Sequence, residues 1–527
     1  MNTKLKNNPV LLLLLASINS VLLFKLSFSL GLLYLLVVVI AVLVIREGRV
    51  NYGVLEECGF PVIEPTLFLG SEPKLHKKIL HLEDVKRFKK YGPIWGSYLG
   101  SKPYVFITEP ELIRQIFVKD FASHFGNRQD YDFKCDIMNE VFEFKKGEEW
   151  STLRKFLSPL FTTSKLKQMS SVIASSAEEY AADLISECDE SSRVKFECRR
   201  RLQIRFIDMF AQTTLGVRME DAKNLDNKFA NAFLKMMRED EEVNWLYPLS
   251  LSFPMIMKLV PIFENESTKL MDSTFRKVIK NRIENGSSST KDFLDLLCDL
   301  WKRVEAGEYK ELGFTETTVL AQCVLFFLGG YETTATMLSL LMWNMANNHE
   351  IQVKMEKELK QALSKSPKGS IDHELINDEN IPYISACINE TIRLYPSLYR
   401  PERICGKDWH HNGISIKKGT VVVIATWAAN RNPKFYPDEP EKFKPERFLP
   451  ENKGIIDPMA FTSFGFGPRN CIGMRFAYET LKMYACNIVK NFRVELRPDS
   501  KLEYKRGAPF AISFYPLYLD LVRRNEN

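Results

Sequence analysis

The 527-residue sequence predicts a mainly α-helical protein with small β-sheets, organised as one large domain behind an N-terminal apolar anchor. Three observations predict this fold class. Long stretches have apolar residues at the helical spacing of three and four, whereas only a few short runs are typical of strands. Hydrophobic residues make up 45% of the chain, which is enough for a large core. The first 45 residues are far more apolar than the rest.

The N-terminal segment contains two apolar runs, which cover Pro9 to Phe24 and Leu26 to Ile45. A helix needs roughly 20 apolar residues to span a bilayer, and the second run meets this length. Arg46 and Arg49 follow it, as expected where a chain leaves the membrane on the cytosolic side. We therefore predict a membrane anchor over residues 1–48, a linker over 49–70 and a main domain over 71–527. A cleaved signal sequence over the first run and a double span are the alternatives.

Within the main domain, the runs Pro93 to Gly100 and Lys102 to Thr108 predict a β-hairpin, and Val421 to Ile424 predicts another strand. Most of the remaining pattern is helical. The proline-rich chain from Pro396 to Pro450 is expected to be irregular outside that strand. The clearest helical patterns cover Ser171 to Cys188, Thr268 to Ile283, Glu316 to Met345, His349 to Leu363 and Met474 to Val489.

Charge and residue spacing exclude several classes of function. The net charge of +6 is small for this length and the basic residues are scattered, so nucleic acid is not an expected partner. The ten cysteines include no C-x-x-C pair, which argues against a zinc site. No glycine-rich fingerprint for NAD or FAD is present, so electrons for a redox reaction would have to come from a separate protein.

The most informative segment runs from Phe464 to Gly473, where Cys471 stands in a glycine-rich turn ahead of a predicted helix. Backbone amides at the start of a helix stabilise a thiolate, so this cysteine is a candidate iron ligand. Phe464 is expected to shield the sulfur, and Arg469 to reach an anionic group such as a haem propionate. Gly467 and Gly473 leave room for a large flat ligand. The other nine cysteines fit small buried hydrophobic residues better.

A second unusual segment, Gly329 to Thr334, interrupts the longest apolar helix. Two adjacent glycines weaken a helix by about 1 kcal/mol each, and a buried carboxylate such as that of Glu332 costs several more unless it is solvated or neutralised. Such an expensive arrangement is typical of a functional site. A solvated Glu332 beside a Thr333 that bonds back to its own helix is the structural alternative.

A third pattern places Glu390 and Arg393 three residues apart on one helix face. Such a pair alone is common and contributes only ~0.3 to 0.5 kcal/mol on a surface. The pair is informative because the chain also contains Arg447, in the stretch Pro445 to Phe448, and the three residues together form a recognisable set.

Together these motifs resemble those of the cytochrome P450 family, over the chain from about Gly59 to the C-terminus. The Cys471 turn is similar to the family's haem-binding loop, and Gly329 to Thr334 to its oxygen-activation motif. Glu390, Arg393 and Arg447 resemble a triad that supports the haem pocket. Phe161 to Lys167 further resembles clan 3 microsomal members. The resemblance implies the P450 fold, with a single large haem domain and haem b ligated by the Cys471 thiolate.

The resemblance also implies roles for single residues. Glu332 and Thr333 are the expected catalytic residues, which relay protons toward dioxygen. Arg128 fits a propionate partner and a surface charge equally well. The expected cofactor-binding residues are Trp150, Arg154, Arg400, Phe464, Arg469 and Gly473. One departure from the family pattern is Asn430, which stands where a histidine is common.

By this resemblance the protein is a monooxygenase that inserts one oxygen atom of O2 into an apolar xenobiotic, steroid or lipid. The implied partners are NADPH-cytochrome P450 reductase as the source of electrons, cytochrome b5 as a further candidate, and the endoplasmic reticulum membrane, with the haem domain facing the cytosol. A haem-thiolate isomerase or dehydratase of peroxides and a non-enzymatic haem or lipid carrier are the alternatives. The Glu332 and Thr333 pair argues against both.

Two surface features and a substrate cavity are expected around this site. The apolar stretch Trp245 to Phe263 is expected to dip into lipid, with buried core as the alternative. Phe326, Phe327 and residues 120–135, 397–399 and 509–512 are expected to line the cavity. The candidate docking patch for an acidic reductase consists of Lys145, Lys146, Lys155, Arg475 and Lys482.

Overall fold

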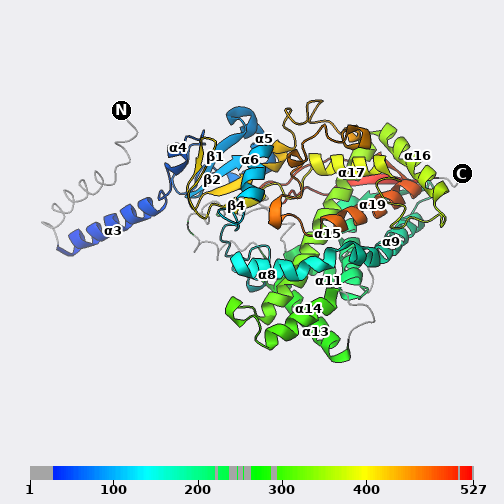
Figure 1. Cartoon of the computed structure of the whole chain (residues 1–527), viewed down its shortest axis with the longest axis horizontal. Coiled ribbons are helices and arrows are strands. Elements are labelled where there is room, and N and C mark those ends of the chain that lie inside the picture. Colours follow the sequence, from blue (N-terminus) through cyan, green and yellow to red (C-terminus); the bar gives the residue numbers. More distant parts are fainter. Residues whose placement is uncertain are drawn as a thin grey trace.

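The computed structural model describes residues 28–219, 224–236, 246, 253, 263–286, 293–507 and 511–524. It has a large helical part, a smaller part rich in strands, and one helix that projects away from both (Figure 1). The helices are α3 Phe28–Glu47, α4 Val54–Glu57, α5 Leu80–Tyr91, α6 Pro110–Arg114, α7 Asp136–Asn139, α8 Gly147–Leu157, α9 Thr163–Ser186, α10 Cys198–Phe210, α11 Lys228–Met236, α13 Asn265–Asn285, α14 Phe293–Glu305, α15 Glu316–Asn347, α16 His349–Lys365, α17 Pro382–Leu394, α18 Thr426–Ala429 and α19 Met474–Asn491.

The strands of the described residues form three small sheets. The largest has the order β1-β2-β7-β4, with β1 and β2 antiparallel, β7 parallel to β2, and β4 antiparallel to β7. A second sheet has the order β3-β9-β8, and the third is the β5-β6 hairpin. The strands are β1 Ile94–Leu99, β2 Lys102–Ile107, β3 Arg193–Glu197, β4 Glu402–Ile404, β5 Trp409–His411, β6 Ile414–Ile416, β7 Val421–Ile424, β8 Phe492–Leu496 and β9 Tyr518–Arg523.

The mainly helical fold class and the predicted hairpin are confirmed, because β1 and β2 pair from Ile94 with Ile107 to Leu99 with Lys102. The predicted strand at Val421 to Ile424 is β7, and the five predicted helices are α9, α13, α15, α16 and α19. The prediction of irregular chain from Pro396 to Pro450 was wrong in part. That region also contains β4, β5 and β6, whose three-residue length is too short to leave a period-two pattern.

Helix α3 carries the second apolar run, and almost all of its surface is exposed (Figure 1). Among the described residues only α3 and α15 are long and apolar enough to cross a membrane, and most of α15 is buried in the core. Helix α3 is therefore the candidate anchor. The first apolar run lies outside the described residues, as does most of Trp245 to Phe263.

The chain after α3 is packed onto the strand-rich part rather than extended. Leu55 is buried, the Ile63 amide donates to the Gly96 carbonyl in β1 at 3.0 Å, and the Tyr52 hydroxyl donates to the Thr66 carbonyl. The predicted domain boundaries stay a prediction, but the chain that follows the anchor has a defined path along β1.

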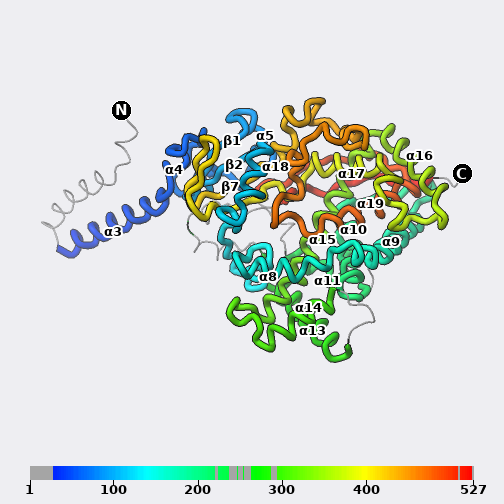
Figure 2. The backbone as a smooth tube through the Cα atoms, viewed as in Figure 1, coloured from blue at the N-terminus to red at the C-terminus, as the bar shows by residue number. Residues whose placement is uncertain are grey.

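Helix α15 forms the centre of the helical part (Figure 2). A capping box at Thr315 and Thr318 begins it, and its apolar side chains pack against α10, α13, α14, α17 and α19. Helix α19, which follows Cys471, packs along both α9 and α15. The cysteine loop therefore rests on the same helices that form the core.

Candidate active site

The Cys471 loop is built by glycines and by one backbone bond. Gly465 and Gly467 have φ of +68° and +72°, which residues with a side chain rarely adopt. A β-carbon at Gly467 would also overlap the Phe117 carbonyl, so this glycine allows the loop to pack on its neighbour. The Cys471 amide donates to the Phe464 carbonyl at 2.9 Å and closes the turn.

Cys471 is the one exposed cysteine among the ten, and seven of the others are buried. Loss of hydration nevertheless raises the pKa of its thiol to about 11, although the Gly473 amide acts in the opposite direction. Cys471 is thus an exposed residue whose thiol neighbouring protein atoms still crowd closely enough to disfavour its charged form. Binding of a metal ion would displace the thiol proton, since a coordinating thiol is held as thiolate. Phe464 lies 5.4 Å from the Tyr478 ring, centroid to centroid, at the base of the loop.

Four arginines gather beside this loop from four different segments. Arg154 of α8 donates to the Asn470 carbonyl at 2.9 Å, next to Cys471. Arg469 donates to the carbonyls of residues 126, 143 and 145 at 2.9, 3.2 and 2.8 Å. Arg128 pairs with Glu143. Arg403 of β4 is buried and donates to the Phe466 carbonyl at 3.4 Å.

These arginines carry more positive charge than the protein itself neutralises there. Burial and the nearby guanidinium of Arg128 lower the pKa of Arg469 to about 9, and the same two causes hold the pKa of Arg403 well below its usual range. Among the described residues, the carboxylates that offset them are those of Glu143 and Glu402. The Nε atoms of Arg128 and Arg403 are buried and have no hydrogen-bond partner among the described residues. Such a cluster is suited to one or two anionic groups.

Trp150 of α8 completes this cluster. Its ring is covered by the Arg469 guanidinium, 4.2 Å from the centroid, and within the part of the chain that the structure describes its buried indole Nε1 has no hydrogen-bond partner. A buried indole N–H normally finds an acceptor, so this one is expected to donate to a ligand. Haem fits the residues present, because it carries two carboxylates for the arginine cluster and an iron for the Cys471 sulfur.

The predicted cofactor-binding residues do not all lie together. Trp150, Arg154 and Arg469 meet at this cluster, and Phe464 and Gly473 belong to the loop. Arg400 instead forms a bidentate salt bridge with Asp84 at 2.7 and 2.8 Å. The arginine of that segment that joins the cluster is Arg403, which the sequence reasoning missed. Its position in a short strand gave no recognisable signal.

Helix α15 presents a partly exposed stripe in the middle of its buried length. Phe326, Gly329 and Thr333 share one helix face at spacings of three and four, and none of them is fully buried. Apart from its chain neighbours and the backbone of its own helix, a β-carbon at Gly329 would meet no atom of the described residues within 4 Å. Phe161 connects this stripe to the cysteine loop, because its ring stacks on that of Phe326 at 5.5 Å and lies 3.7 Å from a β-carbon built at Gly473.

Glu332 is turned away from that stripe toward α10. Its carboxylate accepts hydrogen bonds from Arg199 and Gln203 of α10 and from Thr336 at 3.2 Å. Thr333 remains on the open face, where its hydroxyl donates to the Gly329 carbonyl at 2.7 Å. The two predicted catalytic residues are therefore adjacent in the chain but point toward different surroundings.

The predicted triad is present in the core. Arg393 donates to both Glu390 oxygens at 2.6 and 2.7 Å, and Arg447 lies 3.4 Å from the same carboxylate. Asn430 links this triad to the cysteine loop, because its amide donates to the Arg393 carbonyl at 3.0 Å and to the Ser463 hydroxyl at 2.9 Å. The departure from the family pattern at this position thus has a structural role of its own.

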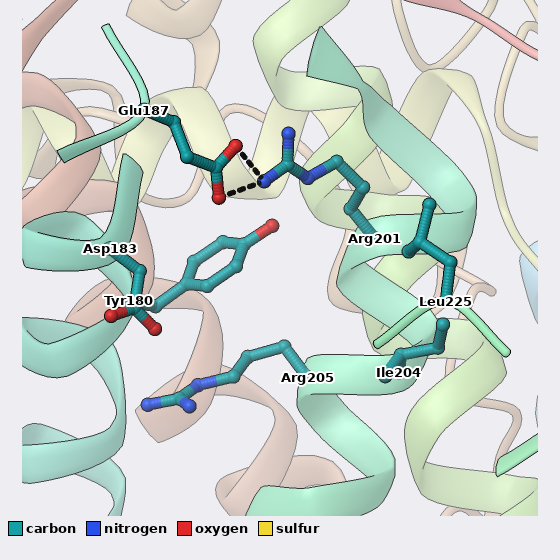
Figure 3. Close-up of a pocket in the computed structure, with 7 residues that line it drawn as sticks. All are labelled: Tyr180, Asp183, Glu187, Arg201, Ile204, Arg205 and Leu225. Carbon is teal, nitrogen blue, oxygen red and sulfur yellow. Dashed lines mark hydrogen bonds and ion pairs between the residues drawn. The ribbon is translucent and has the colours of Figure 1, made fainter. Parts of the chain in front are cut away.

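Another hollow lies between α9 and α10, away from the Cys471 loop. Its lining is charged, and Arg201 donates to both Glu187 oxygens at 2.6 and 2.5 Å beside Tyr180 (Figure 3). An apolar substrate would find few partners there, so this hollow is not the candidate site.

Comparison with known proteins agrees with this geometry. A family model described as cytochrome P450 matches residues 61–517. The chain belongs to the cytochrome P450 family. Its relatives include cytochrome P450 3A16 of Mus musculus, 33% identical over 93% of this chain and 96% of the relative, and cytochrome P450 3A5 of Homo sapiens, 32% identical over 90% and 92%. The protein is therefore a cytochrome P450 monooxygenase, and its exposed apolar helix α3 is consistent with a membrane-anchored member of the family.

Proposed function

We propose that this P450 oxidises apolar small molecules at the endoplasmic reticulum membrane, with its haem domain in the cytosol and with NADPH-cytochrome P450 reductase as its electron donor. The single observation that carries the haem site is the buried, unpartnered Trp150 indole beside four arginines and an accessible thiol. Thiolate-ligated haem supplies the activation of dioxygen when it is bound.

Five residues are proposed to hold the two propionates. Trp150, Arg154 and Arg469 are retained from the sequence prediction, and Arg128 and Arg403 join them. Arg400 is not proposed as a propionate partner, because Asp84 already occupies its guanidinium. Cys471 is proposed as the ligand of the iron, with Phe464 limiting access of water to the sulfur from below.

Thr333 is proposed to move protons on the open face of α15. Its hydroxyl donates to Gly329 and can accept from a water in the free space above that glycine. Glu332 can supply such a proton only after its carboxylate leaves Arg199 and Gln203. We therefore assign Thr333 the direct role and Glu332 a role that depends on rotation of its side chain.

Apolar substrates are favoured by the stripe on α15. The partly exposed side chains around Gly329 are those of Leu325, Phe326, Leu328 and Thr333; the first three are apolar, and none carries a charge. Docking of the reductase is proposed at Lys155 and Arg475, which are exposed. The other three lysines of the predicted patch already pair with acids: Lys145 with Glu140, Lys146 with Asp130 and Lys482 with Asp378. Cytochrome b5 is a candidate for the same face.

A matched pair of variants tests the haem site. Arg403→Leu is expected to speed loss of haem to apomyoglobin about tenfold or more, since one charged hydrogen bond contributes roughly 1.5 to 3 kcal/mol. Arg400→Leu is expected to leave that rate nearly unchanged. Haem dimethyl ester, which lacks the two carboxylates, should bind the unmodified protein more weakly than haem and should remove the difference between the variants. Equal haem loss from both variants would contradict the proposed arginine cluster.

The monooxygenase reaction is tested by reconstitution with reductase, NADPH and a panel of apolar compounds. Substrate-stimulated NADPH consumption with oxygen in the product is the expected result. Conversion of a peroxide without reductase, and no turnover with it, would contradict the proposal.

A further inference from the structure

A buried salt bridge between α5 and the chain after α17 has no place in the function described so far. It joins Asp84 of α5 to Arg400, which lies in the segment between α17 and β4. The two side chains are 1% and 11% exposed, and two hydrogen bonds of 2.7 and 2.8 Å connect them in the bidentate geometry that guanidinium and carboxylate prefer. Burial makes the loss of either partner costly.

Asp84 belongs to a chain of alternating charges on the N-terminal side of the domain. Arg87, one turn further along α5, donates to Asp84 at 3.2 Å and also pairs with Glu72. Glu72 in turn accepts from Lys78 at 2.9 Å. Arg87 and its partner Glu72 thus hold the Asp84 carboxylate in place, so this carboxylate does not move with Arg400 if the segment around Arg400 moves.

Helix α5 also contacts Tyr399, the residue before Arg400, through an aromatic side chain. The buried ring of His81, three residues before Asp84, lies 5.5 Å from the Tyr399 ring and 4.0 Å from the Trp427 ring. The Arg400 guanidinium covers the Phe106 ring of β2 at 5.0 Å. Residues 399 and 400 are therefore held by side chains as well as by the backbone.

The two ends of this segment are held differently. On the C-terminal side Glu402, Arg403 and Ile404 pair with β7 in a regular ladder. On the N-terminal side the Ile512 amide donates to the Ser397 carbonyl at 2.8 Å, Leu398 forms an isolated bridge with Ala511, and the Tyr399 carbonyl accepts from the Thr426 amide at 3.1 Å. Between them stands Leu398, whose side chain is 52% exposed next to a Tyr399 that is 1% exposed.

We propose that Asp84 is a positioning residue that acts through Arg400 to hold Leu398 as a wall of the substrate cavity. This inference rests on the proposed function, because it places Leu398 on the side of the haem where substrate binds. If the clamp is lost, the β4 ladder keeps Arg403 in the arginine cluster, and the movement falls on residues 397–399. Substrate placement is then expected to change while haem binding does not.

Two iron ligands separate these effects. Imidazole needs only the iron, whereas 4-phenylimidazole also needs apolar space beside it, and both are titrated into the full-length holoprotein by the shift of the Soret band. Asp84→Asn is expected to weaken the binding of 4-phenylimidazole about tenfold relative to that of imidazole. The reason is that a cavity wall that is no longer held in place makes less apolar contact with the phenyl ring. Arg400→Lys, which keeps the charge and one contact, is expected to act in the same direction and is the milder variant if Asp84→Asn folds poorly.

Two further variants complete the test. Asp295→Asn removes a carboxylate of similar burial, 6% exposed, that pairs with Arg282 at 2.9 Å between α13 and α14. This control is expected to lower thermal stability but to leave the ratio of the two affinities unchanged. Leu398→Ala is expected to change that ratio directly, since it removes the wall itself.

The proposal is overturned if the affinity ratio is unchanged in both Asp84→Asn and Arg400→Lys, or if Leu398→Ala leaves it unchanged. It is also overturned if the clamp variants lose haem, because the β4 ladder would then not isolate Arg403. Failure of the proposed function is a separate result, seen as the absence of a thiolate spectrum in the unmodified protein.

Discussion

The two faces of α15 at residues 329–336 make opposite uses of the same short motif. On one face Gly329 and Thr333 border free space. On the two sides that flank this open face, Gly330 and Glu332 are packed against α10: a β-carbon at Gly330 would overlap the Phe210 ring, and Glu332 accepts from Arg199. Neighbours in sequence are about 100° apart around a helix, so one motif serves both a cavity and a helix contact.

This difference changes the meaning of the glycine pair. Both glycines belong to the segment that resembles the family's oxygen-activation motif, but of the two only Gly329 borders open space. Gly330 permits close approach of two core helices, which is a structural requirement. The comparison can be tested by substitutions on each face, ordered here by their expected effect on the free energy of unfolding.

The largest effect is expected from Glu332→Ala on the packed face. The substitution removes the buried carboxylate that Arg199, Gln203 and Thr336 contact, and breaking a buried ion pair typically costs about 3 to 5 kcal/mol. Denaturant unfolding followed by tryptophan fluorescence measures this loss. A change below about 1 kcal/mol would show that Glu332 is solvated and belongs to the open face.

A smaller loss is expected from Gly330→Ala. The new methyl group has to displace the Phe210 ring, and overpacking of this kind costs about 1 to 3 kcal/mol. The double variant Gly330→Ala with Phe210→Leu should recover part of this loss, which a double-mutant cycle detects. Additive effects would indicate that the two helices do not meet at this point.

The opposite sign is expected from Gly329→Ala on the open face. Outside its own helix no described atom lies within 4 Å of the new methyl group, and alanine favours a helix over glycine by about 1 kcal/mol. The temperature of thermal unfolding should therefore rise slightly. The affinity for 4-phenylimidazole should fall, because the methyl group reduces the free space above the glycine. Unchanged affinity would place that space outside the ligand site.

Almost no change in stability is expected from Thr333→Ala, since its hydroxyl bonds only to its own helix among the contacts described. Its effect should instead be chemical. Haem content should stay normal, and NADPH oxidation should yield hydrogen peroxide in place of oxidised substrate. Unchanged coupling of NADPH to product would remove Thr333 from proton delivery.

The sequence predicted the long elements and the motif residues, but not which way their side chains turn. Helix α15 was predictable because its apolar run is long and capped, and the β1–β2 hairpin because two strand-like runs are adjacent. The direction of Glu332 depends on Arg199, a residue 133 positions earlier in a helix that no motif singled out. The local sequence pattern around Glu332 gives no information about a partner so distant in the sequence.

The same limit explains why the sequence could not distinguish the roles of the two arginines after α17. Arg400 and Arg403 are three residues apart, and each fits a propionate partner by composition alone. Asp84 forms a salt bridge with Arg400, and the pairing of β4 with β7 places Arg403 in the cluster around Trp150. Both facts are properties of tertiary contacts between distant segments, so only the structure separates the two residues.

The central claim is that the Cys471 sulfur holds the iron of a haem beside Trp150 and the four arginines. The most direct measurement is a reduced carbon monoxide difference spectrum of the full-length protein and of Cys471→Ser, with haem content determined on the same samples. The account predicts a strongly red-shifted Soret band for the unmodified protein and its loss in Cys471→Ser. A band that persists in Cys471→Ser, or that is absent from the folded and haem-loaded unmodified protein, would contradict it.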